Sequence, residues 1–250
     1  MTDEEEQTMY RYEEMTWPEA KERIPAAKGV IIALGSVEQH GPHLPLGTDM
    51  YMGAEVASRV GQLTDCLVLP VIPFGQVWSA KDFPGTISLS HETLCSLLVD
   101  ISLSLHHHGA RSIIMITGHS GNAGVMKDAA RVLYDRHSIE EVYYYAYPDK
   151  KKLAEGIMES PFWNDRLMHS AEMETSMMLA AKPEKVHMER AVCEYPEIPA
   201  ALDFKTIPWS KYSKTGVFGD ATLATKEKGE EYLERMVRRI ADSINEVLNR

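Results

Sequence analysis

The chain has 250 residues, 44% of them hydrophobic, which is enough to bury the core of a single large α/β domain spanning residues 1–250. Its 26 basic residues against 37 acidic ones give a net charge of −11, which argues against nucleic acid or an anionic membrane as the main partner. No apolar run is long enough to span a bilayer, and the acidic N-terminus, expected to be frayed, lacks the features of a signal peptide, so we expect a cytoplasmic protein. The widely spaced Cys66, Cys95 and Cys193 are expected to be ordinary buried thiols.

Short apolar runs and helical patterns alternate along the chain. Strands are predicted at about 29–34, 66–72, 112–116 and 141–147, and the first and third of them are expected to be buried. Helices are predicted from Pro18, over about 50–64, from the N-cap Ser90 to Leu105, after Asn122, after Pro148, over 169–180 and over about 226–249. Two helical stripes are expected to be buried: Met52, Val56, Val60 and Leu63, and then Tyr232, Met236, Ile240 and Ile244. Such alternation predicts an α/β fold with a mostly parallel central sheet and right-handed crossovers.

Residues 35–49 form a loop, stiffened by glycine and proline, between the first strand and the helix that follows it. The loop contains Glu38, His40, His43 and Asp49, whose oxygen and nitrogen atoms suit a hard to borderline divalent metal. Glu38 and His40 are two residues apart, so in an extended segment both point to the same side. Two alternatives remain: Asp49 could serve only as a helix N-cap, and Glu38 or His43 could be solvated loop residues.

Residues 117–122 repeat this arrangement after the third strand, with His119 in a glycine-rich turn. If the strands are parallel, His119 lies at the same sheet edge as Glu38 and His40. Ser120 to Asn122 could instead form an anion-binding nest or a helix cap. The histidine run 106–108 resembles a metal tract, but its place at a helix C-terminus before a glycine favours a capping role, and we exclude it from the site.

Two further segments could complete a pocket. The aperiodic loop 73–89 contains Trp78, Ser79, Lys81 and Asp82, which either line a pocket or belong to a rim loop packed by its own aromatic side chains. The irregular, proline-containing segment 183–215 could cover the pocket or form subunit contacts.

The helix over 169–180 carries an acidic residue on its apolar stripe. Glu174 shares a face with methionines, whereas Glu172 lies roughly 160° away around the helix axis and need not be buried. An unpaired buried carboxylate costs several kcal/mol, so Glu174 needs a metal or a cationic histidine as partner. A salt bridge to a buried Arg or Lys is the alternative.

Five segments resemble the creatininase (creatinine amidohydrolase) family. They are residues 35–49 (GSVEQHGPHLPLGTD), 83–89 (FPGTISL), 117–122 (TGHSGN), 169–176 (HSAEMETS) and 216–220 (GVFGD). The resemblance covers nearly the whole chain, and its first motif is long and specific. It implies a three-layer αβα fold, a two-metal amidohydrolase site and a homohexamer.

Carried over by position, the resemblance implies that Glu38, Asp49 and His119 hold one metal ion, while His40 and a bridging Asp49 hold the other. In creatininase proper, a glutamate two residues after the histidine matching His119 completes the second site, but this chain has Gly121 there. The missing carboxylate must come from elsewhere, and Glu174 is the candidate. This departure puts creatinine itself in doubt as the substrate.

The combined hypothesis is a hydrolase of a cyclic amide or related small amide. Two divalent ions, Zn²⁺ or Mn²⁺ with Fe²⁺ as a further candidate, would share a hydroxide that attacks the carbonyl carbon. His169 would donate a proton to the leaving nitrogen, and Glu174 would bind the second metal or orient the nucleophile and His169. The alternatives are a formamide deformylase, a lactone or sugar-ring hydrolase on the same metals, and a non-catalytic phosphate-binding module.

Overall fold

The computed structural model describes residues 10–161 and 168–249, so the expectation for the N-terminal tail lies outside the described residues. The central sheet contains β1 (Gly29–Leu34), β2 (Cys66–Val68), β3 (Ile113–Thr117) and β4 (Val142–Ala146). Its strand order is β2-β1-β3-β4, and all pairs are parallel, as the alternating pattern predicts. In the β1–β3 register Leu34 lies opposite Thr117, so the loops that follow these two strands begin side by side.

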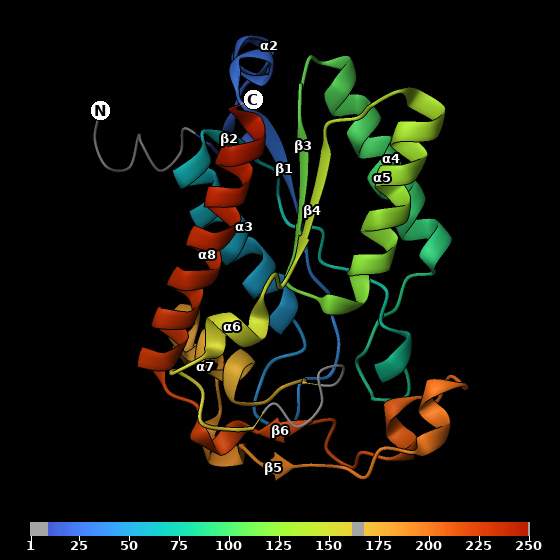
Figure 1. The fold of residues 1–250 in the computed structure, drawn as a ribbon, viewed down its shortest axis with the longest axis vertical. Helices are drawn as coiled ribbons and strands as arrows, with labels where there is room; N and C mark the ends of the chain where they lie inside the picture. Colours follow the sequence, from blue (N-terminus) through green and yellow to red (C-terminus); the bar gives the residue numbers. More distant parts are fainter. Residues whose placement is uncertain (1–9, 162–167, 250) are drawn as a thin grey trace.

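Helices cover both faces of this sheet and complete the three-layer αβα fold, which confirms the predicted architecture (Figure 1). One face packs against α3 (Thr48–Thr64), α7 (Glu172–Ala181) and α8 (Lys226–Leu248). The other packs against α2 (Trp17–Ala26), α4 (His91–His107) and α5 (Ala123–His137). Alternate side chains of β1 enter the two cores, Ile31 on the α3 side and Ile32 on the α4 side, as the period of two in a strand requires.

The remaining elements are short and lie near the C-terminal edge of the sheet or at its connections. They are α6 (Lys150–Ala154), the antiparallel pair β5 (Cys193–Glu194) and β6 (Gly219–Asp220), and the 3₁₀ turns η1 (Tyr12–Glu14), η2 (Trp78–Ala80), η3 (Ser120–Asn122), η4 (Pro183–Lys185), η5 (Met188–Arg190), η6 (Ala200–Asp203), η7 (Trp209–Lys211) and η8 (Ala221–Leu223). Segment 183–215 therefore has little regular structure, as expected.

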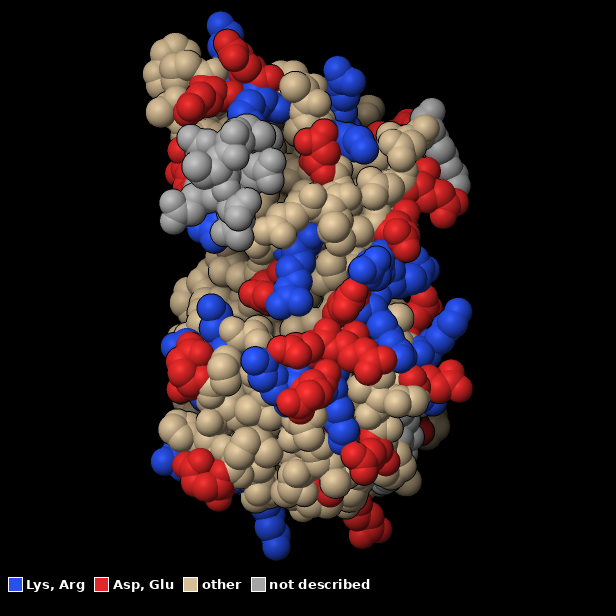
Figure 2. Space-filling view, turned by 90° about the vertical axis from the view of Figure 1, so that its left-hand side faces the viewer, with Lys and Arg blue, Asp and Glu red and all other residues tan. Residues whose placement is uncertain are grey.

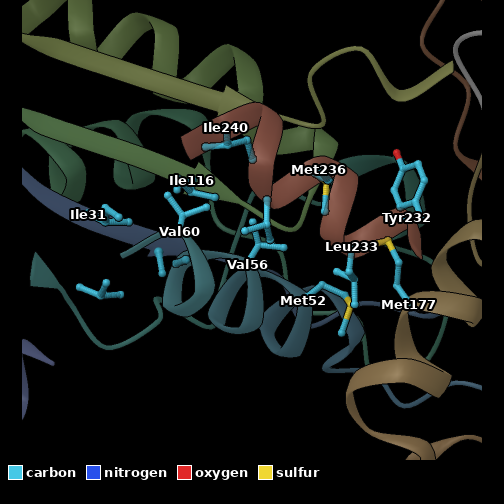
Figure 3. Packing of buried hydrophobic residues seen from close by; sticks show 14 of the residues in the cluster. Ile31, Met52, Val56, Val60, Ile116, Met177, Tyr232, Leu233, Met236 and Ile240 are labelled. Atoms are coloured by element: carbon cyan, nitrogen blue, oxygen red, sulfur yellow. The ribbon is translucent and has the colours of Figure 1, made fainter. Parts of the chain in front are cut away.

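The larger core joins α3 and α8 over the sheet (Figure 3). The predicted stripe of α8 is fully buried, and so are Met52, Val56 and Val60 of α3. Leu63, however, is 54% exposed, so its predicted burial is wrong. Periodicity gives the direction of a side chain around the helix axis, but the covering of a last helical turn depends on which neighbours extend that far.

Two smaller expectations also need correction. The second strand was predicted over 66–72 but β2 ends at Val68, because Pro70 has no N–H to donate; pairing resumes only at the isolated Leu34–Ile72 bridge. Among the thiols, Cys66 is buried and Cys193 is exposed, so uniform burial is wrong. The N-cap of α4 is confirmed, since the Ser90 side chain accepts a hydrogen bond from the Thr93 N–H.

The outer face of α8 carries both acidic and basic side chains. Acidic and basic side chains intermix on the side of the molecule shown in Figure 2. Pairs four residues apart, such as Glu231–Arg235 and Glu234–Arg238, contribute to this pattern. Within residues 10–161 and 168–249, no helix combines the length and the apolar character that crossing a membrane requires.

Candidate metal centre

The site lies where the loops after β1 and β3 meet the first turn of α3. Close backbone approach makes this possible, because a Cβ on Gly118 would lie 2.3 Å from the Asp49 carbonyl oxygen. Glycine at this position therefore lets α3 start directly against the end of β3. As a result Asp49, buried in the first turn of α3, faces side chains from both strand-end loops.

The first group of candidate ligands contains Glu38, Asp49 and His119. The Nδ1 atom of His119 lies 2.8 Å from Asp49 Oδ2 and 3.1 Å from Glu38 Oε1. Ser36 donates a hydrogen bond to Asp49 Oδ2 at 2.7 Å, which orients the carboxylate. All three side chains are buried, so their charges interact in a medium of low polarity.

The second group contains His40, Asp49 and Glu174. His40 Nε2 lies 3.1 Å from the other carboxylate oxygen of Asp49, Oδ1, and 3.9 Å from Glu174 Oε2. Asp49 therefore turns one oxygen toward each group, which is the geometry of a bridging carboxylate. A further group, Glu38, His40 and His169, overlaps both.

Backbone groups hold the outer atoms of these ligands. The far ring nitrogens of His40 and His119 donate to the carbonyl oxygens of Glu38 and Gln76, at 3.2 and 3.0 Å, which leaves the inner nitrogens unprotonated in the neutral rings. Glu174 Oε2 accepts the Ser170 N–H at 2.6 Å. Such outer contacts are typical of metal-ligating histidine and carboxylate side chains.

The composition of the site fits a divalent cation. Three buried carboxylates and two imidazoles converge there without a thiolate, a set that suits zinc, manganese or iron. Glu38 Oε1 is fully buried and accepts no hydrogen bond from the described residues. His119 Nδ1 lies beside this oxygen but carries no proton when the ring is neutral, so a cation would provide the missing partner.

Electrostatics within the site are strong. Burial opposes charge on His40, but the carboxylates of Asp49, Glu38 and Glu174 outweigh it and raise the pKa of His40 to about 9. Burial opposes charge on His119 as well, but Glu38 and Asp49 raise its pKa well above the usual value. The pKa of Asp49 is held well below its usual range by His40 and His119, although burial alone would raise it. The site is thus built to hold positive charge.

His169 differs from the other two imidazoles. Its Nε2 donates to the Gln39 carbonyl at 2.8 Å, while its Nδ1 lies 3.9 Å from both Glu38 Oε1 and Glu174 Oε2. Burial and the neighbouring His40 charge lower the pKa of His169 to about 4. The neutral ring therefore presents an unprotonated Nδ1 to the site, and its packing against Trp209, with ring centroids 4.7 Å apart, fixes its plane.

A cavity of about 280 Å³ opens onto the candidate ligands. Its lining includes Glu38, Asp49, His119, Glu174 and His169, together with Gln76, Val77, Trp78, Ser79, Ser120, Gly121, Lys150, Met168 and Trp209. The cavity is thus partly aromatic and partly polar, as small-molecule sites generally are. Loop 73–89 was predicted either to line a pocket or to form a rim, and Trp78 and Ser79 do line the cavity. Lys81 does not, and its ammonium lies 4.6 Å from the centre of the Trp78 ring.

Several candidates lie outside the ligand groups. His43 is buried and contacts Thr175, with Nε2 2.8 Å from Oγ1, so the solvated alternative is wrong for it. Asn122 hydrogen-bonds Gly35 and Thr117, which ties neighbouring loops together and makes this residue a structural link. The excluded histidine run 106–108 is exposed at the end of α4.

Glu172, whose burial the helical pattern left open, has no exposed surface. Its carboxylate accepts hydrogen bonds from Lys228 at 2.5 Å and from the Ser160 hydroxyl at 2.6 Å. The salt bridge considered for Glu174 therefore forms at Glu172 instead. The residues from Glu172 to Met178 of α7 are all buried, so no single apolar stripe describes this helix.

Lys150 and Met168 escaped the sequence-based reasoning, and so did the part that Gln76 plays within loop 73–89. Gln76 contributes its backbone carbonyl, which no side-chain pattern reveals. Lys150 follows the fourth strand directly, and the rule that ligands bind beyond the carboxyl ends of parallel strands would have drawn attention to it.

Comparison with known proteins gives consistent matches over most of the chain. The family model described as creatinine amidohydrolase matches residues 13–244. A creatinine amidohydrolase from Pseudomonas putida is 30% identical over 93% of this chain and 95% of its own length. A 3-dehydro-scyllo-inosose hydrolase from Thermotoga maritima and a mycofactocin precursor peptide peptidase from Mycolicibacterium smegmatis are each 30% identical, over 92% and 86% of this chain and 83% of their own lengths.

Solved structures agree with this. A mutant creatininase of the Zn–Zn type superimposes with a TM-score of 0.87 at 29% identity, covering 96% of this chain and 98% of the other. A manganese form of creatininase superimposes with a TM-score of 0.84 at the same identity and coverage.

Proposed function

The chain belongs to the creatininase family of metal-dependent amidohydrolases, and on that premise we propose that it hydrolyses a C–N bond of a cyclic amide or related small amide. The observation that carries the proposal is the pair of ligand groups that share Asp49 at the base of a cavity, with His169 beside them. In the reaction, water adds its hydroxyl to the carbonyl carbon and its proton to the nitrogen as the C–N bond breaks.

We assign the metal ligands to two adjacent sites. Glu38, Asp49 and His119 would hold one ion, and His40, Asp49 and Glu174 would hold the other. The Zn and Mn forms of the structural relatives support Zn²⁺ or Mn²⁺ as the occupants. When bound, such ions polarise a substrate carbonyl and lower the pKa of a water molecule.

Glu174 takes the place of the glutamate that creatininase proper has at the position of Gly121. A Cβ at position 121 would lie 2.3 Å from His119 Nε2, so in this conformation the loop leaves no space there for a side chain. Glu174 instead enters from α7, and the Ser170 N–H holds its carboxylate. The second site is therefore built from helix α7 rather than from the loop after β3.

His169 is the proton-transfer residue in this proposal. Since its Nε2–H is engaged by the Gln39 carbonyl, only Nδ1 is free to accept a proton on the cavity side. His169 Nδ1 takes a proton from the attacking water and gives it to the departing nitrogen, which yields a neutral amine. Its low pKa keeps it unprotonated, and hence ready to act as a base, at neutral pH.

The cavity favours a small substrate with a flat part. Trp78 and Trp209 line it, and a volume of about 280 Å³ suits a small ring. The relative that acts on an inosose favours sugar-ring hydrolysis as the second candidate on the same metals. A phosphate-binding module fits less well, because Glu38, Asp49 and Glu174 would all repel a phosphate.

Membership of the family also leads us to propose a homohexamer, and the expected cytoplasmic location is a second proposal. Light scattering on the purified protein tests the first, since a monomeric mass at micromolar concentration would exclude a hexamer. Cell fractionation tests the second.

The experiment that tests the function measures bound metal and hydrolysis together. Glu38→Gln and His119→Ala are expected to lose most of the bound Zn²⁺ and all hydrolysis of a panel containing creatinine, other cyclic amides, formamides and lactones. His106→Ala, which changes an exposed histidine, is the matched control and should keep both. Full metal retention in both site variants would overturn the assignment, and hydrolysis of lactones alone would favour the second candidate.

A further inference from the structure

One cation lines the cavity. Among the described residues that line it, Lys150 is the only Lys or Arg, and the lining also includes three carboxylates, two imidazoles and two tryptophan rings. Lys150 is the first residue of α6 and follows the turn that leaves β4. This turn enters the cavity at the same sheet edge as the candidate ligands, as ligand-binding turns do in parallel sheets.

The turn that presents Lys150 is anchored on both sides. The Tyr147 hydroxyl donates to the Gly118 carbonyl at 2.8 Å, which joins the turn to the loop that contains His119. Asp149 accepts a hydrogen bond from Arg239 of α8 at 2.7 Å. The backbone that precedes Lys150 is therefore fixed relative to the candidate metal ligands, so its position in the cavity is a property of the fold.

Lys150 has no direct partner within the part of the chain that the structure describes. Its ammonium group forms no ion pair or hydrogen bond there, and the adjacent Asp149 is paired with Arg239. Burial raises the pKa of the nearby Glu174, and the Lys150 charge opposes this rise less than His40 and the Ser170 N–H do. Under the proposed function Glu174 binds a cation, so the Lys150 charge remains available to a ligand.

We propose that Lys150 binds a carboxylate of the substrate, so that the natural substrate is a small amide bearing a negative charge. This inference rests on the proposed function, because it places the reacting amide at the candidate metal ligands and the charged substituent at Lys150. A partly buried ammonium without an internal partner gains most from a charged acceptor. The cavity of about 280 Å³ has room for a small ring and one small substituent, which favours a carboxylate over a bulkier group.

Neighbouring lysines do not offer the same site. Lys81 lies over the Trp78 ring, and Lys205 lines a separate hollow that shares Trp78 and Trp209 with this cavity. Lys152, two residues beyond Lys150, is exposed and lies outside the cavity lining. Lys152 thus serves as a matched control for a change of charge in the same helix.

The test uses two metal-binding probes that differ by one carboxylate. Acetohydroxamate and succinic monohydroxamate are titrated into the Zn²⁺-loaded enzyme by calorimetry, with wild type, Lys150→Met, Lys150→Arg and Lys152→Met compared. We expect succinic monohydroxamate to bind wild type roughly tenfold more tightly than acetohydroxamate, the value of one charged hydrogen bond. The preference should disappear in Lys150→Met, persist in part in Lys150→Arg and remain unchanged in Lys152→Met.

The outcomes separate this inference from the proposed function. Equal binding of the two probes by wild type, or a preference that survives in Lys150→Met, overturns the role of Lys150 while leaving the metal site intact. If neither probe binds the Zn²⁺-loaded enzyme, the metal site itself fails, and the inference with it. Unchanged acetohydroxamate binding by Lys150→Met shows that the variant is folded and keeps its metal.

Discussion

Adding a single methyl group at Gly121 should disable the candidate metal centre. A Cβ there would lie 2.3 Å from His119 Nε2 and 2.8 Å from the Gln76 carbonyl oxygen, between the two partners of the hydrogen bond that orients His119. Ordinary contact begins at 3.4 Å, so the imidazole must move by 3.4 − 2.3 = 1.1 Å or the loop must rearrange. The Gly121 backbone is not left-handed, so the effect of alanine is steric rather than conformational.

Loss of an outer hydrogen bond of a ligating histidine typically costs about 10–100-fold in metal affinity, and we expect Gly121→Ala to fall in this range. Zn²⁺ titration calorimetry on metal-free protein measures the effect. Gly124→Ala is the matched control, because Gly124 lies in α5 with nothing within 4 Å of its added Cβ. This control should bind Zn²⁺ as wild type does and gain about 0.5–1 kcal/mol of stability from the better helix former. Wild-type Zn²⁺ affinity in Gly121→Ala would refute the reasoning.

Three further predictions follow from particular contacts. Because Asp49 belongs to both ligand groups, Asp49→Asn should lose metal from both sites, whereas His40→Ala should lose only part of the bound metal, and metal analysis measures this. Chelation should lower the melting temperature of wild type but not that of Asp49→Asn. Glu172→Gln should cost roughly 1.5–3 kcal/mol at pH 7 by denaturant unfolding, since it weakens the charged hydrogen bond from Lys228. Burial alone would raise the pKa of Glu172, but Lys228 and Ser160 lower it. The contribution of Glu172 to stability is therefore present above about pH 4.3, the pKa in the unfolded chain, and is lost as pH falls through the lowered pKa of the folded protein. The stability advantage of wild type over Glu172→Gln should shrink at pH 3, and an undiminished difference there would contradict the assignment. Trp209→Ala should weaken acetohydroxamate binding more than Trp209→Phe does, because phenylalanine retains a ring against His169, and equal effects of the two would show that this ring contact is unimportant.

Local patterns predicted most of the elements of the fold. The apolar run that became β1, the α4 cap at Ser90 and the stripe of α8 depend on neighbours a few residues apart, which the sequence displays directly. The exposure of Leu63, which was wrongly predicted to be buried, and the burial of Glu172, which the pattern left open, both depend on distant segments. Glu172 is buried because Lys228, more than fifty residues later in the chain, supplies its counter-charge.

The candidate site, too, combines features that the sequence displays directly with features that depend on distant segments. Its residue types were readable from the chain, because three short segments rich in carboxylate and imidazole side chains each stand at the end of a strand or at the start of a helix. The sequence by itself thus determined which donors were available and which class of cation they suit. It also showed the absence of a side chain at Gly121.

Only the tertiary structure decided which donors meet and what faces them. Asp49 turns one oxygen to each ligand group because α3 begins against the end of β3, and Glu174 reaches the second group because α7 packs beside α3. Lys150 enters the cavity because β4 pairs with β3. Each of these relations depends on strand order and helix packing across long separations in the chain, and no local periodicity contains that information.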